Sequence, residues 1–299
     1  MLTGLTIVII GGDARYLEVI GKGVEMDATV KVVGYGQLEQ QLTGVSEEKL
    51  TSDLFASVDV LILPVVGCDE NGEVRASFSQ DKLILLEEHI AAMPKHALIY
   101  TGVAKPYLIQ LCESYGMKLI QVLERDDVAI YNSIPSAEGA LMMAIQNTDI
   151  TIHGSSCIVL GMGRTGFTMT RTLQGIGAKV RIGVRKQEHF ARAEEMGWNP
   201  FLIEHLADVV SGTDLIFNTI PTMIITAQIL SKMSPMAVII DLASAPGGTD
   251  FRFAEKRRIK AILAPGLPGI VAPRTAGMIM ANSIYQSVLE EFTLREDEQ

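Results

Sequence analysis

A regular alternation of short β-branched runs with longer amphipathic stretches is the feature of this sequence that most constrains its fold. Runs rich in Val and Ile are typical of strands buried on both faces of a parallel sheet, and amphipathic stretches are typical of the helices that cover such a sheet. The alternation predicts parallel sheets with right-handed crossovers. The predicted strands are 5–10, 29–33, 59–64, 97–101 and 118–122 in the first half, and 156–160, 179–184, 214–218, 238–241 and 261–263 in the second.

These strands form two separate series, which predicts two doubly wound α/β domains within the 299 residues. We place the first domain at residues 1–131 and the second at 150–274, with a long hinge helix, 132–149, between them. Pro135 and Ser136 suit the first turn of that helix, because proline lacks an N–H group and a serine hydroxyl can cap free N–H groups.

The end of the chain predicts a long last helix. A proline- and glycine-rich segment, 264–269, follows the last predicted strand and is expected to be irregular. Pro273 then starts a helix over about 274–294, which is longer than a crossover needs. We therefore predict that residues 275–299 cross back and pack on the first domain.

The composition excludes several classes of partner. The net charge of -10 argues against nucleic acid or an anionic membrane, because both require basic surfaces. No apolar stretch reaches 18 residues without a glycine, a proline or a charge, which argues against a transmembrane span. The 3 cysteines are far apart and odd in number, which argues for a reducing compartment and against a zinc site. We expect a soluble, cytoplasmic protein without a bound metal.

The second predicted domain carries the pattern G-x-G-x-x-G at Gly161, Gly163 and Gly166, directly after a predicted strand. In a Rossmann-like domain the first glycine permits a tight turn, the second lets a pyrophosphate approach the backbone, and the third lets the helix pack on the strand. The N–H groups and dipole at the helix start then bind phosphate. Arg164 and Thr165 can add donors. The alternative is a glycine turn in a ligand-free domain of the same fold.

The end of the next strand indicates which dinucleotide binds. NAD-binding domains have Asp or Glu here, which accepts a hydrogen bond from the ribose 2′-OH. This chain has Val184, Arg185 and Lys186 instead. Arg185 can stack on adenine and form bidentate hydrogen bonds with a 2′-phosphate, and Lys186 supplies a second positive charge. The sequence therefore predicts NADP(H) as the cofactor, and a solvated basic loop is the alternative.

Two further strand ends are expected to face the cofactor, because ligands bind outside the carboxyl ends of parallel strands. Each has a polar residue at its tip that can reach ribose or nicotinamide, although such residues also cap turns. The cofactor-binding candidates at these strand ends are Asn218, Thr219, Ile220, Pro221, Asp241, Leu242, Ala243 and Ser244.

The first domain is expected to bind the substrate. Its glycine loop lacks the third glycine and puts Asp13 where a pyrophosphate would have to lie, which argues against a nucleotide site. Asp13 could orient Arg15 toward a substrate, and a local ion pair at a helix start is equally consistent. The substrate-binding candidates are strand-end and helix-start residues that suit an anion, namely Asp13, Arg15, Thr101, Lys105, Arg274 and Thr275.

No histidine stands where a catalytic acid or base is expected, so the catalytic residue stays unknown. The architecture is similar to that of D-2-hydroxyacid dehydrogenases, but the segment 265–273 lacks the late histidine of that family. The sequence Asp241-Leu242-Ala243 followed by Gly247-Gly248 is similar to alanine dehydrogenase, whose early lysine and histidine are not evident here.

Six segments spread along essentially the whole chain resemble the A subunits of bacterial dipicolinate synthase. The late segment rich in proline and glycine is far more specific than the glycine loop. The segments are GGDAR at 11–15, NSIPSAEG at 132–139, GMGRTG at 161–166, GVRK at 183–186, DLAS at 241–244 and PGLPGIVAPRTAG at 265–277.

This resemblance implies an NADP-dependent oxidoreductase of sporulation that oxidises a cyclic dihydrodipicolinate-type dicarboxylate to pyridine-2,6-dicarboxylate. It also implies that the partner is a flavoprotein-like B subunit and that the location is the mother cell of a spore former, and we expect a homo-oligomer. Two alternatives stay open: another NADP-linked dehydrogenase, of amino-acid or shikimate type, and a non-catalytic NADP-binding regulatory subunit. A screen for NADPH formation tests the first, and NADP binding without turnover beside the B subunit would indicate the second.

Overall fold

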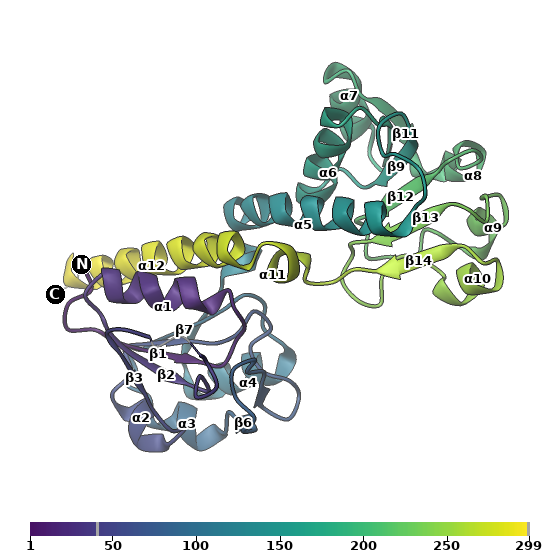
Figure 1. Cartoon of the computed structure of the whole chain (residues 1–299). Coiled ribbons are helices and arrows are strands. Elements are labelled where there is room, and N and C mark those ends of the chain that lie inside the picture. The colour runs from purple at the N-terminus through teal and green to yellow at the C-terminus, as the bar shows by residue number, and fades with distance from the viewer. Residues whose placement is uncertain (40–41, 298–299) are drawn as a thin grey trace. The chain divides into compact units, whose positions relative to one another are not determined.

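The structure, a computed structural model, describes residues 1–39 and 42–297. The chain divides into two compact units, Met1–Val128 with Pro273–Gln299, and Ala129–Ala272 (Figure 1). Each unit contains a six-stranded parallel sheet covered by helices. The prediction of two doubly wound α/β domains is thereby confirmed.

The sheet of the first unit has the strand order β3-β2-β1-β4-β7-β8, with every neighbouring pair parallel. Successive residues of a strand point to opposite faces, and both faces are buried. Helices α1 and α12 cover one face, and α2, α3 and α4 cover the other. The elements are β1 (Thr6–Ile10), α1 (Tyr16–Glu25), β2 (Thr29–Val33), β3 (Val45–Glu47), α2 (Ser52–Ala56), β4 (Val60–Ile62), β5 (Glu73–Val74), β6 (Leu83–Ile84), α3 (Glu87–Ala92), β7 (Leu98–Thr101), α4 (Pro106–Tyr115), β8 (Lys118–Gln121), η1 (Val122–Glu124) and α12 (Pro273–Asp297).

The second unit repeats this arrangement with the strand order β11-β10-β9-β12-β13-β14. Helices α5 and α6 pack on one face of the sheet, and α8, α9 and α10 pack on the other. The elements are α5 (Asp126–Asn147), β9 (Ser156–Leu160), α6 (Arg164–Gly175), β10 (Lys179–Val184), α7 (Gln187–Glu195), β11 (Asn199–Leu202), η2 (Ile203–His205), α8 (Leu206–Val209), β12 (Leu215–Asn218), α9 (Ala227–Ser231), β13 (Val238–Asp241), α10 (Phe251–Lys256), β14 (Lys260–Leu263) and α11 (Leu267–Val271).

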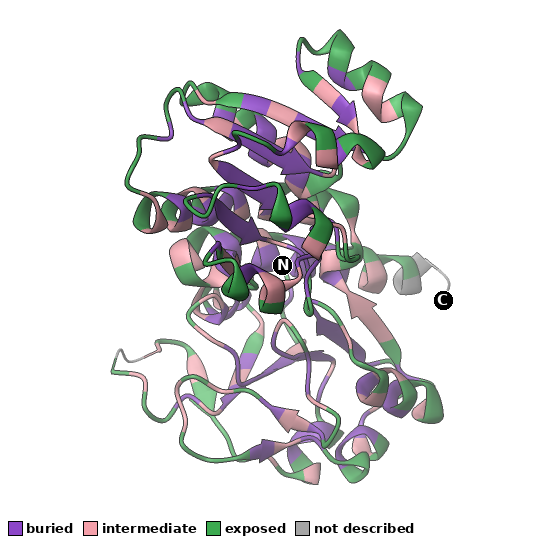
Figure 2. Cartoon of the chain, turned by 90° about the vertical axis from the view of Figure 1, so that its right-hand side faces the viewer, coloured by how far each residue is buried: buried purple, intermediate pink, exposed green. Residues whose placement is uncertain are grey.

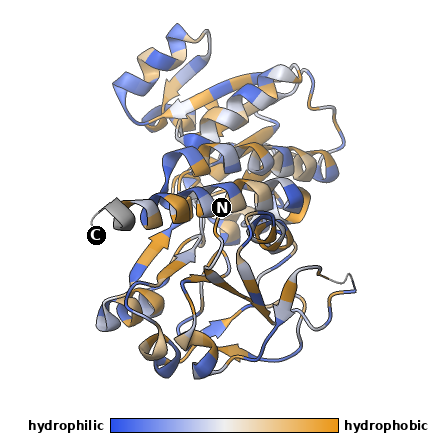
Figure 3. Ribbon diagram, turned by 90° about the vertical axis from the view of Figure 1, so that its left-hand side faces the viewer, coloured by the Kyte–Doolittle hydropathy of each residue, from blue (hydrophilic) through white to orange (hydrophobic). Residues whose placement is uncertain are grey.

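Burial and hydropathy explain why the strands could be predicted. The central strands of both sheets are buried (Figure 2), and hydrophobic residues dominate them (Figure 3). All ten predicted strands are present: five are shorter than predicted by one to three residues, four have the predicted bounds, and the last begins one residue earlier, at Lys260. No described helix is long and apolar enough to cross a membrane.

The strands that the sequence pattern missed lie at sheet edges or outside the main sheets. Strand β3 is half exposed or exposed along its length, and β11 contains Pro200, which a strand tolerates at an edge. Strands β5 and β6 form a separate antiparallel pair of two residues each. None of these segments has the continuous β-branched run that marks a buried strand.

The prediction that Pro135 and Ser136 start the connecting helix is wrong. Helix α5 begins at Asp126, and Pro135 lies inside it. Hydroxyl groups accompany the proline: Ser133 Oγ donates to the Ile130 carbonyl at 2.6 Å, and Ser136 Oγ donates to the Asn132 carbonyl at 2.9 Å. These hydroxyls bond to the carbonyls on either side of Tyr131, whose own carbonyl loses its helical donor because Pro135 has no N–H group.

Near the end of the chain, helical structure begins at an earlier residue than predicted. Residues 264–269 were expected to be irregular, but Leu267–Val271 forms the short helix α11, in which Pro268 occupies a first-turn position that tolerates proline. The last helix, α12, starts at Pro273 as predicted. It packs on α1 in the first unit, where the Tyr285 hydroxyl donates to the Val19 carbonyl at 2.8 Å. The predicted return of the last helix to the first domain is therefore confirmed.

The α1–α12 contact depends on a glycine. A Cβ added to Gly277 would overlap the backbone oxygen of Arg15, which cannot rotate away. We expect Gly277→Ala to lower the free energy of unfolding by about 1–3 kcal/mol, measured by urea denaturation.

Gly175→Ala is the matched control, because a Cβ there meets nothing within 4 Å and the residue ends helix α6. It should leave stability unchanged or raise it by up to about 1 kcal/mol. Equal stabilities of the two variants would contradict the close packing of α1 on α12.

Candidate functional site

The switch point of the second sheet lies between β9 and β12, the two central strands whose crossovers run in opposite directions. Doubly wound sheets bind ligands in the crevice outside the carboxyl ends of these strands. Gly161 directly follows β9, and Thr219 directly follows β12. The glycine loop therefore occupies the position at which this fold binds ligands.

Close packing within the loop explains two of its glycines. Gly161 has φ +101°, and a Cβ there would lie 2.5 Å from Thr219 Oγ1. The same hydroxyl donates to the Leu160 carbonyl at 2.7 Å. A Cβ on Gly166 would overlap the Gly161 backbone oxygen. Both positions thus require glycine for the fold itself.

Gly163 is different, because a Cβ there would meet nothing within 4 Å. Its φ of -82° and ψ of -169° suit any residue. It caps helix α6, and the N–H groups of a first helical turn have no partner within the helix. An open backbone at the start of a 12-residue helix fits a pyrophosphate. Arg164 is exposed and Thr165 is half-buried beside it.

The cations predicted to select NADP lie at the end of β10. Val184 is buried, whereas Arg185 and Lys186 are exposed. Arg185 Nη2 donates to Thr222 Oγ1 at 2.5 Å, which ties this strand end to the loop after β12. Lys186 Nζ lies 3.2 Å from a Glu188 carboxylate oxygen. Both cations are accessible, and Thr222, which sequence reasoning missed, holds Arg185.

Asn218 and Asp241 are buried, and their side chains form hydrogen bonds with other groups of the protein. Asn218 Nδ2 donates to Asp241 Oδ1 at 2.9 Å and to the Ile220 carbonyl at 3.0 Å. Asp241 also accepts from the N–H groups of Ala243 and Gly248 and, at 2.6 Å, from Thr249 Oγ1. Their side chains thus hold the loops after β12 and β13 and have no room for a ligand.

The remaining candidates lie on those two loops. Thr219 and Leu242 are half-buried, Ile220 and Ala243 are buried, and Pro221 and Ser244 are exposed. The loop after β13 also contains the cis peptide bond Ala245–Pro246. The buried side chains of Ile220 and Ala243 are thus the least accessible to a ligand.

In the first unit, backbone covers the glycine loop that resembles a nucleotide site. The Gly12 N–H donates to the Arg75 carbonyl at 2.8 Å, and the Ser77 N–H donates to the Gly12 carbonyl at 2.8 Å. A Cβ on Gly11 would lie 2.6 Å from the same Arg75 oxygen. This segment occupies the space that a pyrophosphate would need.

Asp13 and Arg15 form a local ion pair in the first unit. Arg15 Nε and Nη2 donate to the Asp13 carboxylate at 2.9 and 2.6 Å. Burial acts to raise the pKa of Asp13, but the hydrogen bonds and charge of Arg15 outweigh it and hold that pKa below its usual value. The Arg15 side chain is 14% exposed. The geometry matches the alternative of an ion pair at a helix start.

The other substrate candidates are dispersed. Thr101 is 1% exposed, and its hydroxyl donates to the Pro64 carbonyl at 2.6 Å, so it holds two strand ends together and offers no free donor. Arg274 is 84% exposed, with Nε 3.5 Å from Glu18 Oε1, and Thr275 is exposed beside it. Lys105 lines a pocket of the first unit that is large enough for a small molecule.

That pocket has a volume of about 340 Å³ and lies at the carboxyl ends of β4 and β7, within the first unit. It brings Lys105 together with Arg75, a residue that no sequence pattern indicated. Strand β5, which ends one residue before Arg75, is too short to show periodicity. The lining residues are Val66, Gly67, Cys68, Asp69, Glu73, Arg75 and Lys105.

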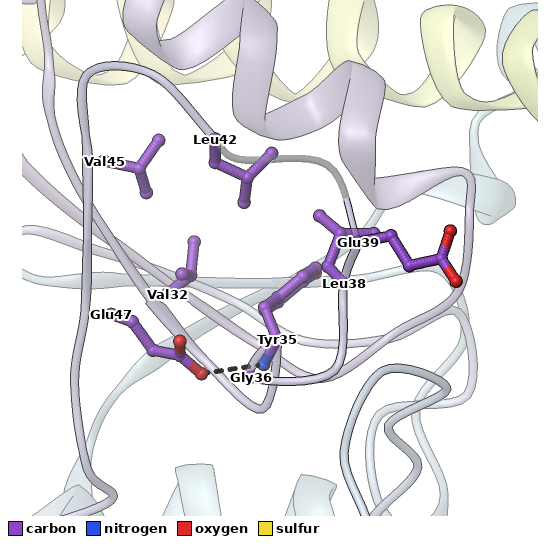
Figure 4. Close-up of a pocket in the computed structure, with 8 residues that line it drawn as sticks. All are labelled: Val32, Tyr35, Gly36, Leu38, Glu39, Leu42, Val45 and Glu47. Carbon is purple, nitrogen blue, oxygen red and sulfur yellow. Dashed lines mark hydrogen bonds between the residues drawn. The ribbon is translucent and has the colours of Figure 1, made fainter.

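A second pocket, of about 350 Å³, lies beyond the end of β2 and is drawn in Figure 4. Two of its lining residues are acidic, and its described lining contains no cation. Glu47 Oε1 accepts from the Tyr35 N–H at 3.3 Å, and the Glu39 carboxylate points away from that pair. Its charge is unsuited to an anionic ligand. The lining residues are Val32, Tyr35, Gly36, Leu38, Glu39, Leu42, Val45 and Glu47.

The histidines of the first unit have structural partners. His89 is buried against the Phe55 ring, and its Nδ1 accepts from the Leu86 N–H at 3.0 Å. Burial lowers the pKa of His89. His96 Nε2 lies 2.8 Å from Asp59. Neither histidine lines the pocket that contains Lys105.

Comparisons with known proteins agree with this architecture. The family model for the N-terminal domain of the dipicolinate synthase A subunit matches residues 6–123. The family model for the NAD binding domain of D-isomer specific 2-hydroxyacid dehydrogenases matches residues 136–247. The second match supports an oxidoreductase with a nicotinamide dinucleotide bound in the second unit.

Individual relatives resemble the whole chain. The A subunit of dipicolinate synthase from Bacillus subtilis (strain 168) is 48% identical over 290 residues, which are 97% of this chain and 98% of that protein. The crystal structure of the A subunit from Bacillus halodurans has a TM-score of 0.93 at 48% identity and covers 96% of this chain and 98% of its own. The crystal structure of the Bacillus subtilis protein has a TM-score of 0.93 at 47% identity and covers 98% of each chain.

Proposed function

Because the chain belongs to the family of dipicolinate synthase A subunits, we propose that it oxidises a cyclic dihydrodipicolinate-type dicarboxylate to pyridine-2,6-dicarboxylate with NADP as electron acceptor. The open backbone at Gly163, at the switch point of a dehydrogenase-type domain, is the observation that carries this proposal. We further propose that the enzyme acts with a B subunit during sporulation, in the cytoplasm of the mother cell.

The cofactor would be held by the glycine loop and the neighbouring strand ends. The N–H groups at the start of α6 would bind the pyrophosphate, and Arg185 and Lys186 would receive the 2′-phosphate. Thr222 positions Arg185 through its hydrogen bond. A bound nicotinamide would supply the hydride acceptor for this oxidation.

The chain's own residues have a limited chemical task in this oxidation. The ring loses a hydride and a proton as it becomes aromatic, and the proton can pass to water. The requirement is therefore to bind and orient a dicarboxylate, which agrees with the absence of a histidine from the described lining of the Lys105 pocket.

The overall reaction can be tested directly. Purified A and B subunits, supplied with NADP+ and the product of dihydrodipicolinate synthase, should form NADPH and pyridine-2,6-dicarboxylate in equal amounts. NADP+ binding without turnover would instead support a non-catalytic nucleotide-binding subunit.

Arg185→Ala tests the choice of cofactor. Removing a guanidinium that pairs with a 2′-phosphate should weaken NADP+ binding roughly 10- to 100-fold and change NAD+ binding by less than about threefold. Calorimetric titration of both dinucleotides gives the two values.

The control is Arg252→Ala, which removes an exposed cation of the same unit whose side chain has no hydrogen bond or ion pair to the described residues. It should change neither affinity. Equal losses of NADP+ and NAD+ affinity in Arg185→Ala would refute the assignment of NADP.

A further inference from the structure

The pocket around Lys105 combines a position and a volume that suit a ligand. It lies at the carboxyl ends of β4 and β7, the side of a doubly wound sheet on which ligands bind. Its volume of about 340 Å³ falls within the range of about 300–1,000 Å³ found for small-molecule sites.

The carboxylates of this pocket are already engaged. Glu73 forms an ion pair with Lys82 at 2.8 Å. Asp69 Oδ1 accepts from the N–H groups of Asn71 and Glu73 at 2.8 Å each. The N–H groups of Glu73 and Asn71, together with the nearby charges of Lys105 and Lys82, hold the pKa of Asp69 below its usual value. These acids therefore have partners before any ligand arrives.

The two cations of the pocket are not engaged in this way. Arg75 and Lys105 are exposed, and neither side chain has a hydrogen bond or an ion pair to any described residue. Burial raises the pKa of Cys68 to about 11, so the thiol adds no negative charge at neutral pH. The lining holds two cations and two carboxylates, and Lys82, which lies outside the lining, pairs with Glu73. Asp69 is therefore the one lining carboxylate without an ion pair to balance Arg75 and Lys105, which leaves the pocket attractive to an anion.

Hydrogen bonds hold the backbone that carries each cation. The loop before Lys105 is fixed by the Val103 N–H, which donates to the Val65 carbonyl at 2.6 Å, and by the Ala104 N–H, which donates to Gln121 Oε1 at 2.5 Å. The segment of Arg75 is joined to Gly12 by two backbone hydrogen bonds. The backbone of both cations is thus held in place beside one pocket, and their exposed side chains can turn toward a ligand there.

We infer that Arg75 and Lys105 bind the two carboxylates of the dicarboxylate substrate in this pocket. The inference rests on the proposed function for the identity of the ligand. Arg15 and Arg274 are less suited to this role, because Arg15 is paired with Asp13 and Arg274 lies beside the carboxylate of Glu18. Paired cations recognise a dicarboxylate through charge-assisted hydrogen bonds.

The test is calorimetric titration of the full chain with pyridine-2,6-dicarboxylate and, separately, with pyridine-2-carboxylate, in the presence and absence of NADP+. Arg75→Gln and Lys105→Gln should each weaken dicarboxylate binding roughly 10- to 100-fold, since each removes one charge-assisted contact. Arg75→Lys and Lys105→Arg keep the charge and should retain more of the affinity. The monocarboxylate should bind more weakly to the unsubstituted chain and depend strongly on only one of the cations.

The double variant Lys49→Gln/Arg252→Gln is the control for net charge, because it removes two exposed cations that are not among the lining residues of this pocket. Its dicarboxylate affinity should match that of the unsubstituted chain, and thermal unfolding should show that all variants are folded. Unchanged affinity in Arg75→Gln and Lys105→Gln, an equal loss in the control, or no dicarboxylate binding by the unsubstituted chain would overturn the inference. Failure of the chain to bind NADP+ would instead remove the proposed function.

Discussion

Replacing Gly163 with Val is expected to weaken dinucleotide binding at least about 100-fold while leaving the fold of the second unit intact, because the loss of two phosphate hydrogen bonds costs about that much. The added side chain meets no protein atom within 4 Å of its Cβ, and the backbone angles at this position suit any residue. The side chain would therefore enter only the space that the pyrophosphate needs. Gly163→Ala should give a smaller loss in the same direction. Calorimetry with NADP+ and thermal unfolding supply the two measurements.

Gly175→Ala is the control for this experiment, because it adds a methyl group to open space at the other end of the same helix. It should bind NADP+ like the unsubstituted chain. Gly166→Ala should differ from both, because its Cβ would overlap the Gly161 oxygen and destabilise the fold itself. Normal NADP+ affinity in Gly163→Val would place the cofactor elsewhere and contradict the proposed site.

Asp241→Ala is expected to lower the free energy of unfolding of the second unit by about 3–5 kcal/mol. The buried carboxylate accepts hydrogen bonds from Asn218, Ala243, Gly248 and Thr249, and its removal leaves these donors without an acceptor. This is a large part of the roughly 5–15 kcal/mol that stabilises a typical domain. Urea denaturation followed by circular dichroism measures the change.

Asp250→Ala is a matched control from the same loop. Asp250 caps α10 by accepting from the Phe253 N–H at 3.0 Å, and loss of a helix cap costs about 1 kcal/mol. If Asp241→Ala weakened NADP+ binding without a comparable loss of stability, Asp241 would contact the cofactor directly, as the strand-end pattern predicts. The observed hydrogen bonds predict the opposite result.

The fold could be predicted from the sequence wherever the burial of an element leaves a recognisable pattern of hydrophobic residues. A central strand of a parallel sheet is buried on both faces, so Leu160 and its neighbours form a continuous apolar run. The edge strands Val45–Glu47 and Asn199–Leu202 lack such a run and were missed, whereas the edge strands Lys118–Gln121 and Lys260–Leu263 contain consecutive apolar residues and were predicted. Pro135 misled the prediction of α5, because a helix held by tertiary packing tolerates an internal proline.

The candidate site divides in a similar way. The glycine loop could be located from spacing, because Gly161 and Gly166 satisfy local steric demands between a strand and the helix that follows it. The hydrogen bonds of Asn218 and Asp241 could not be predicted, since their partners are distant from them in the sequence. Whether a polar residue at a strand end faces a ligand or supports a loop depends on those distant partners.

The sequence alone determined the two parallel sheets, the return of the last helix to the first unit and the position of the glycine loop, because each follows from local periodicity, chain length or glycine spacing. Only the tertiary structure decided which cations are available to a ligand. Arg15 is paired with Asp13, whereas Arg75 and Lys105, 30 positions apart in the numbering, line one pocket without an ion pair to the described residues. Net charge and residue type are properties of the chain, but the pairing of charges depends on distances that exist only after folding.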